Sequence, residues 1–164
     1  MRPNGIFING VYEEVLQEIL QIQAELPEQI LFLQPYSSRV MVELRDNPPA
    51  VDSPLHLYLS ITTDLPTVRY KAEIVGWEDK RQIPRPKWKV LERLLWTLQP
   101  HEGGLYDMSQ AVDGQSANLL YVRRLQRLEQ PFSVNQLEKY FGGGPVSANR
   151  TTAGGWTYLT GSPP

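Results

Sequence analysis

The feature that most constrains the fold is a pair of alternating segments between Leu55 and Trp77. In both segments apolar residues occupy every second position, which is typical of strands with one buried face. These residues are Leu55, Leu57, Leu59 and Ile61 in the first segment and Val68, Tyr70, Ala72 and Ile74 in the second. The sequence Asp64-Leu65-Pro66-Thr67 between them has the composition of a turn. We therefore predict a β-hairpin with one face in the core.

The other face of this hairpin carries polar side chains and is the predicted place for binding residues. A four-residue loop at 64–67 sets a register in which Tyr58 lies opposite Glu73 and Ser60 lies opposite Lys71. Three states are open for this face. It can be exposed to solvent, it can line a pocket, or the C-terminal segment can cover it and make Tyr58 and Trp77 part of a second core.

The rest of the chain predicts further helices and strands, and so an α+β fold. Apolar residues three or four positions apart predict a helix that ends at Pro27 and another between Pro86 and Pro100. A short helix is expected after Ser133 because that residue begins a capping box. Strands are expected at 30–33, 40–45, 118–128 and 156–159.

The length of 164 residues fits one domain, which we expect to span residues 1–164 with a possible seam at 84–86. The first residues lack the basic and apolar regions of a secretory signal. No apolar run approaches the ~20 residues that a membrane span needs. We therefore expect a cytoplasmic protein that has no membrane contact.

The inventory of catalytic groups is small. The absence of cysteine excludes disulfides, thiolate nucleophiles and cysteine-based metal sites. His56 and His101 are the two histidines, and their spacing does not match a metal-binding pair. Glu78 and Asp79 could hold a divalent cation, although adjacent carboxylates at a strand end are commonly just solvated. We predict no catalytic residue, no metal and no cofactor.

Charge is distributed unevenly along the chain, although the net charge is only −2. Residues 1–34 contain five acids and one base, whereas residues 80–91 contain five bases and no acid. Arg123, Arg124 and Arg127 form a second basic group. This distribution permits a basic patch on an acidic protein, and it is also compatible with solvated faces that never converge.

The segments PLHLYLS at 54–60 and YKAEIVGW at 70–77 resemble two strands of PUA-like domains of the EVE and ASCH kind. The resemblance implies a small mixed or antiparallel β-barrel, or a strongly curved sheet, with flanking helices. It also implies that a pocket at the edge of the barrel reads RNA or a modified base. Tyr58, Ser60 and Trp77 match positions where that family places pocket residues.

The leading hypothesis is a non-enzymatic module that recognises nucleic acid, RNA or DNA, or a modified base. Tyr58 and Trp77 would stack on a base, Ser60 would form a hydrogen bond, and basic residues would contact phosphate. The predicted ligand-binding residues are Tyr36, Tyr58, Ser60, Lys71, Trp77, Lys80 and Arg81. One alternative is a protein-interaction or accessory subunit of a bacterial complex with no ligand of its own, and another is an enzyme that uses His56 or His101.

Overall fold

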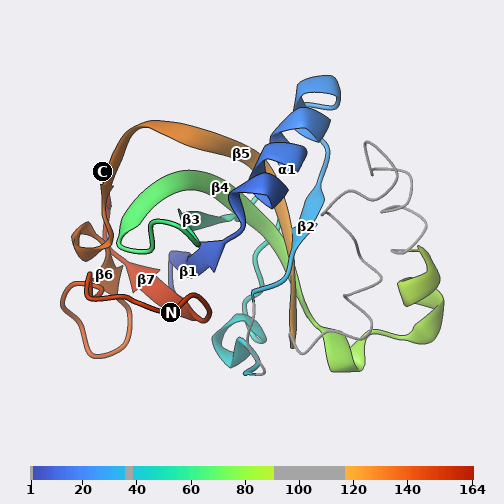
Figure 1. The fold of residues 1–164 in the computed structure, drawn as a ribbon. Coiled ribbons are helices and arrows are strands. Elements are labelled where there is room, and N and C mark those ends of the chain that lie inside the picture. The colour runs from blue at the N-terminus through green and yellow to red at the C-terminus, as the bar shows by residue number, and fades with distance from the viewer. Residues whose placement is uncertain (1, 36–38, 91–116) are drawn as a thin grey trace.

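The computed structural model describes residues 2–35, 39–90 and 117–164, whose strands form a seven-stranded mixed sheet (Figure 1). The strands are β1 (Gly5–Val11), β2 (Leu31–Leu33), β3 (Leu55–Ile61), β4 (Thr67–Asp79), β5 (Asn118–Ser133), β6 (Glu138–Lys139) and β7 (Trp156–Thr160). The helices are α1 (Glu13–Glu25), the 3-10 turns η1 (Val42–Leu44), η2 (Lys80–Gln82) and η3 (Val134–Gln136), and a helical segment at 85–90.

The strand order is β2-β5-β4-β3-β1-β7-β6, and β1 and β3 are the parallel pair. β4 and β5 are long and curve across the molecule (Figure 1). In the described part of the chain β2 and β6 lie at opposite ends of this order, so the sheet does not close into a barrel. The predicted α+β class is therefore confirmed, and the predicted barrel is not.

The predicted hairpin is present as β3 and β4, but its register differs from the prediction by two residues. Tyr58 pairs with Lys71, not with Glu73, which instead pairs with His56. The cause is the connection, because Ile61 already begins a turn in which its carbonyl oxygen accepts from the Asp64 N–H at 3.0 Å. A shift of two residues leaves the side chains of the paired residues 55–59 and 70–74 on their predicted faces. The alternating apolar residues of β3 accordingly lie in the core.

The second face of the hairpin is covered at Tyr58 and Ser60, whereas Trp77, which was predicted on the same face, packs against the first core. Tyr58 is 7% exposed and belongs to a second core cluster with Phe7, Val68 and Leu159. The C-terminal part of the chain supplies the rest of this cluster: Phe132, Val134, Leu137 and Val146. The sheet is thus buried on both faces at β1, where Ile6 and Ile8 enter the first cluster and Phe7 enters the second.

Helix α1 lies on the first core through Leu16, Ile19 and Ile22, of which the apolar spacing predicted Ile19 and Ile22 but not Leu16. Its docking is also polar. The Gln23 amide accepts from the Leu125 N–H and donates to the Leu125 carbonyl oxygen, both at 2.8 Å. These backbone groups lie beside a β-bulge at which Arg124 has a φ of 55°. The bulge removes Leu125 from regular pairing, and the Gln23 side chain satisfies both of its polar groups.

Several predicted elements differ in the structure. The alternation at 40–45 is not a strand: it contains η1, where Met41 and Leu44 are buried three positions apart and Val42 is 50% exposed. The short helix after Ser133 is the single turn η3. β1 was not predicted. Of the helix expected between Pro86 and Pro100, residues 91–100 lie outside the described residues.

Among the described helices, none combines the length and the apolar character that crossing a bilayer requires.

Gly10 provides a test of how β1 fits between its neighbours. It lies at an irregularity of β1 with a φ of +85°, and a Cβ there would lie 2.7 Å from Leu65 Cδ2 and 2.8 Å from Ala153 Cβ. Gly143 is also left-handed, but a Cβ there would meet nothing within 4 Å. We expect Gly10→Ala to lower the free energy of unfolding by about 2–4 kcal/mol, and Gly143→Ala by about 1 kcal/mol. Equilibrium urea unfolding measures both, and equal losses would contradict this packing.

Tyr70 provides a pH test of the contact between α1 and the sheet. Its hydroxyl donates to Glu13 Oε2 at 2.8 Å, and burial together with that carboxylate raises the pKa of Tyr70 from 10.0 to about 12. Because the folded-state pKa is the higher one, this contribution to stability is complete below pH 10 and is lost as the pH rises to about 12. We expect Tyr70→Phe to show a shallower loss of stability over this interval. Parallel pH profiles for wild type and variant would contradict the assignment.

Candidate functional site

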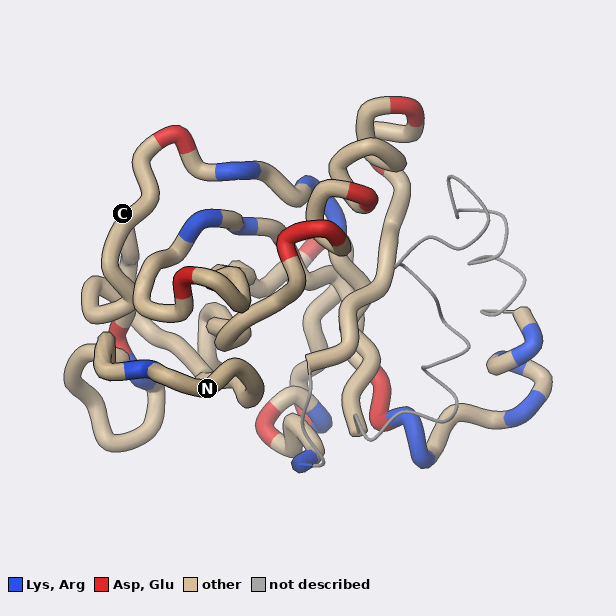
Figure 2. The backbone as a smooth tube through the Cα atoms, viewed as in Figure 1, with Lys and Arg blue, Asp and Glu red and all other residues tan. Residues whose placement is uncertain are grey.

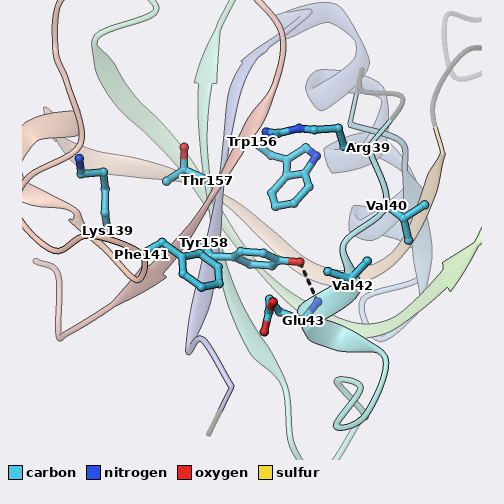
Figure 3. A pocket seen from close by; sticks show the side chains of 9 residues that line it. All are labelled: Arg39, Val40, Val42, Glu43, Lys139, Phe141, Trp156, Thr157 and Tyr158. Carbon is cyan, nitrogen blue, oxygen red and sulfur yellow. Dashed lines mark hydrogen bonds between the residues drawn. The ribbon is translucent and has the colours of Figure 1, made fainter.

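An open pocket of about 490 Å³ lies between β7, the residues around β6 and the segment that contains η1 (Figure 3). β7 contributes Trp156, Thr157 and Tyr158 to its wall. Lys139 comes from β6, and Phe141 follows it by two residues. The η1 segment contributes Arg39, Val40, Val42 and Glu43. The pocket therefore gathers three parts of the chain that are far apart in sequence.

Aromatic rings form one side of the pocket. Trp156 and Tyr158 are two positions apart in β7, so the alternation of the strand places both on one face. Their centroids are 4.7 Å apart in an edge-to-face contact, and Phe141 adds a third ring 5.9 Å from Tyr158. Phe141 is 57% exposed, which is unusual for so large an apolar side chain. The backbone pairing of β6 with β7 holds it beside Tyr158.

Charged side chains flank these rings. The Arg39 guanidinium lies over Trp156, with its Cζ 5.5 Å from the ring centroid, as Figure 3 shows. Lys139 provides a second cation. Glu43 provides one carboxylate, which makes no ion pair or hydrogen bond with the described residues. The pocket thus combines ring surfaces, two cations and a single group that only accepts hydrogen bonds.

The wall formed by the η1 segment is held by a buried amide. Asn118 is completely buried at the start of β5. Its Nδ2 donates to the Arg39 carbonyl oxygen at 2.7 Å, and its Oδ1 accepts from the Met41 N–H at 2.9 Å. The same oxygen accepts from Trp77 Nε1 at 2.9 Å. One side chain therefore fixes the backbone on which Arg39 and Val40 enter the pocket.

Tyr158 holds the other end of that wall. Its hydroxyl oxygen accepts from the Glu43 N–H at 3.3 Å (Figure 3). Burial raises the pKa of Tyr158 to about 12, so the ring is uncharged at neutral pH. Trp156 Nε1 is buried and makes no hydrogen bond within the described ranges. A buried donor without a partner costs free energy.

Of the residues that the sequence predicted as ligand contacts, Tyr58 and Ser60 are buried away from this pocket. Tyr58 lies in the second core, with the Phe132 ring 6.1 Å away. Ser60 is completely buried, and its hydroxyl oxygen accepts from the Gly10 N–H at 3.0 Å. Both side chains thus have structural partners in the described fold.

The other predicted contacts are dispersed. Trp77 is half-buried against the first core and donates to Asn118. Lys80 is 8% exposed, its Nζ donates to Gln34 Oε1 at 2.8 Å, and burial lowers its pKa. Arg81 is exposed and pairs with the buried Asp79. Lys71 is half-buried on the middle of β4. Tyr36 lies outside the described residues, as does His101. The structure does not bring these residues together on one surface.

Sequence reasoning missed Arg39, Lys139, Phe141, Trp156 and Tyr158. A signal was present in the density of aromatic residues near the C-terminus, where Tyr140, Phe141, Trp156 and Tyr158 occur within a short stretch. In the part of the chain that the structure describes, no group of three or more histidine, aspartate or glutamate side chains could hold a metal ion.

Comparisons with protein-family models, with curated proteins and with solved structures found no match to this chain. The resemblance to PUA-like domains therefore stays a prediction, and the pocket has to be interpreted from its own chemistry.

Asn118 tests whether a single amide supports the pocket wall. Asn118→Ala would leave the Arg39 carbonyl, the Met41 N–H and the Trp77 indole N–H without this partner in the interior. We expect it to lower the free energy of unfolding by about 2–4 kcal/mol. Asn135→Ala is the matched control, because Asn135 is exposed and its side chain makes no contact of this kind. Urea unfolding followed by tryptophan fluorescence compares them, and equal stability of the two variants would contradict the role of Asn118.

Proposed function

We propose that this protein is a non-enzymatic binding module whose pocket receives a nucleotide: a planar base that carries phosphate. The observation that carries the proposal is the combination of Trp156, Tyr158 and Phe141 with Arg39 and Lys139 around one open pocket. Bases stack on aromatic rings and on guanidinium planes, and cations hold phosphate. The pocket volume of about 490 Å³ lies within the range of small-molecule sites.

The charges favour an anionic ligand over a cationic one. An aromatic pocket can also attract a cation to the face of a ring. Here the Arg39 guanidinium already lies over the Trp156 ring, so the protein supplies that cation itself. Arg39 and Trp156 together then present a stacked platform with a positive charge, and Lys139 adds another positive charge.

The Glu43 carboxylate supplies selectivity in this proposal. A carboxylate accepts hydrogen bonds and repels phosphate, so it would face the N–H groups on the edge of a base while the phosphate lies toward Arg39 and Lys139.

The proposed ligand class is the one that the sequence suggested, but the proposed site lies elsewhere in the molecule. Trp156 and its neighbours take the stacking role that was predicted for Tyr58 and Trp77. Arg39 and Lys139 take the phosphate contacts that were predicted for Lys71 and Lys80. The reason is burial, because Tyr58 and Lys80 have less than a tenth of their surface exposed.

Titration with nucleoside monophosphates, followed by tryptophan fluorescence, tests the proposal. We expect saturable quenching that Trp156→Leu weakens by about tenfold or more, since stacking is worth about 1–3 kcal/mol per base. Lys139→Gln should weaken binding several-fold at ~50 mM salt and less at high salt, because phosphate contacts are screened.

Lys71→Gln removes the same charge outside the pocket and is the matched control. Ribose 5-phosphate, which has phosphate but no base, should bind much more weakly than any nucleotide. The absence of nucleotide binding, or equal weakening by Lys139→Gln and Lys71→Gln, would refute the proposed function.

A further inference from the structure

A row of basic side chains continues from the pocket wall. We call it the basic rim, and it consists of Arg45, Arg81, Arg85, Lys87 and Lys89. Arg45 directly follows η1, which forms part of the pocket wall, and Arg81 lies in η2 at the end of β4. Arg85, Lys87 and Lys89 belong to the helical segment at 85–90. In Figure 2 blue segments lie at the lower part of the molecule, from the η1 region to this helical segment.

The pocket and the basic rim meet at the same end of the β4–β5 pair. Asn118, which binds the Arg39 carbonyl oxygen, is the β-sheet partner of Asp79. The Asp79 carboxylate in turn accepts from the Arg81 guanidinium at 3.1 and 3.2 Å. The hydrogen bonds from Arg81 and, less strongly, the charge of Arg45 hold the pKa of Asp79 below its usual range. Arg39, Arg45 and Arg81 therefore surround one short stretch of sheet.

The cations of the basic rim differ in their availability. Arg81 is paired with Asp79, and Lys87 is paired with Glu78. Arg45, Arg85 and Lys89 are exposed, and they make no ion pair with any residue that the structure describes. After pairing, the net positive charge of the rim thus rests on Arg45, Arg85 and Lys89.

Four acidic side chains lie on α1, away from the rim, whereas Glu78 and Asp79 lie within it and Asp46 directly follows Arg45. Helix α1 carries Glu13, Glu14, Glu18 and Glu25, and it lies at the opposite end of the view in Figure 2. Lys and Arg number 16 and Asp and Glu 18 in the whole chain. The unpaired Arg45, Arg85 and Lys89 are therefore the cations of the rim that can attract a polyanion.

We propose that the ligand is a single-stranded nucleic acid, with one base in the pocket and the neighbouring phosphates along the basic rim. This inference rests on the proposed function, because it takes the pocket as a base site. The strand has to be single because a base that stacks on Trp156 and Arg39 has left its own helix. A row of cations beside a stacking platform is the arrangement by which proteins follow an unpaired strand.

The test compares a mononucleotide with hexanucleotides of RNA and of DNA over a range of salt concentrations. Wild type should bind at least one hexanucleotide about tenfold more tightly than the mononucleotide at ~50 mM salt. Arg45→Gln combined with Arg85→Gln should remove most of this gain and leave mononucleotide affinity unchanged. The slope of log K against log salt for the hexanucleotide should fall by about 1.4, since each single-strand phosphate contact contributes about 0.7.

Lys71→Gln combined with Arg127→Gln is the matched control, because it removes the same charge from the middle of β4 and β5, away from the rim. It should leave both affinities near those of wild type. Equal affinity for mononucleotide and hexanucleotides, equal effects of the two double variants, or tighter binding of a duplex would each overturn the inference while the proposed function stands. Failure of the mononucleotide to bind would instead remove the proposed function itself.

Discussion

The structure depends most on the buried amide of Asn118. An amide in the interior is stable only when its donors and acceptors are used, and Asn118 uses them on groups from two other parts of the chain. It joins the first residue of β5 to the indole of Trp77 in β4 and to the backbone of Arg39 and Met41. These bonds fix the backbone of the segment that contains η1, whose Met41 and Leu44 side chains are buried in the first core. The buried Asn118 side chain thus determines the position of this pocket wall.

Irregularities in the sheet determine where the rest of the molecule can attach. The bulge at Arg124 exposes the backbone of Leu125 to Gln23 and so positions α1. The irregularity of β1 at Gly10 directs an N–H toward Ser60 and brings the backbone close to Ala153. Strand β1 therefore reaches the C-terminal segment through a contact that only glycine permits. In both places a break in the ladder is where a distant segment binds, and regular pairing would have left no free group for it.

The parts of the fold that were predicted from sequence are those with a local period. The hairpin faces as far as Ile74 follow from alternation, and the burial of Ile19 and Ile22 in α1 follows from a spacing of three and four, so these were predicted. The register was not, because turn geometry at Ile61 and Asp64 decides it. The spacing of Met41 and Leu44 fits a 3-10 turn, but the alternation of Val40, Val42 and Leu44 within so short a segment imitated a strand. Strand β1 was missed because Asn9 and Gly10 suggest a turn.

The pocket could not be predicted in the same way. Its residues come from 39–43, 139–141 and 156–158, and no period relates segments that meet only through sheet pairing and the Asn118 bonds. The hairpin face on which the prediction placed the site is polar in sequence, with Tyr58 and Ser60 among its residues. Burial of that face depends on Val134, Leu137 and Val146, which are far away along the chain. These distant residues cover the face that the sequence predicted to be a binding surface, so Tyr58 is buried.

The pairing of β1 with β7 also governs when the molecule can be complete. Gly5 pairs with Leu159, and Phe7 pairs with Thr157, so β1 waits for a strand that lies far away along the chain. During synthesis on a ribosome, β1 can find β3 early but keeps an unpaired edge until residues 156–160 emerge. Contacts of such long sequence separation slow folding and prolong the life of that edge. The pocket, two rings of which are on β7, therefore cannot form before residues 156–160 have emerged.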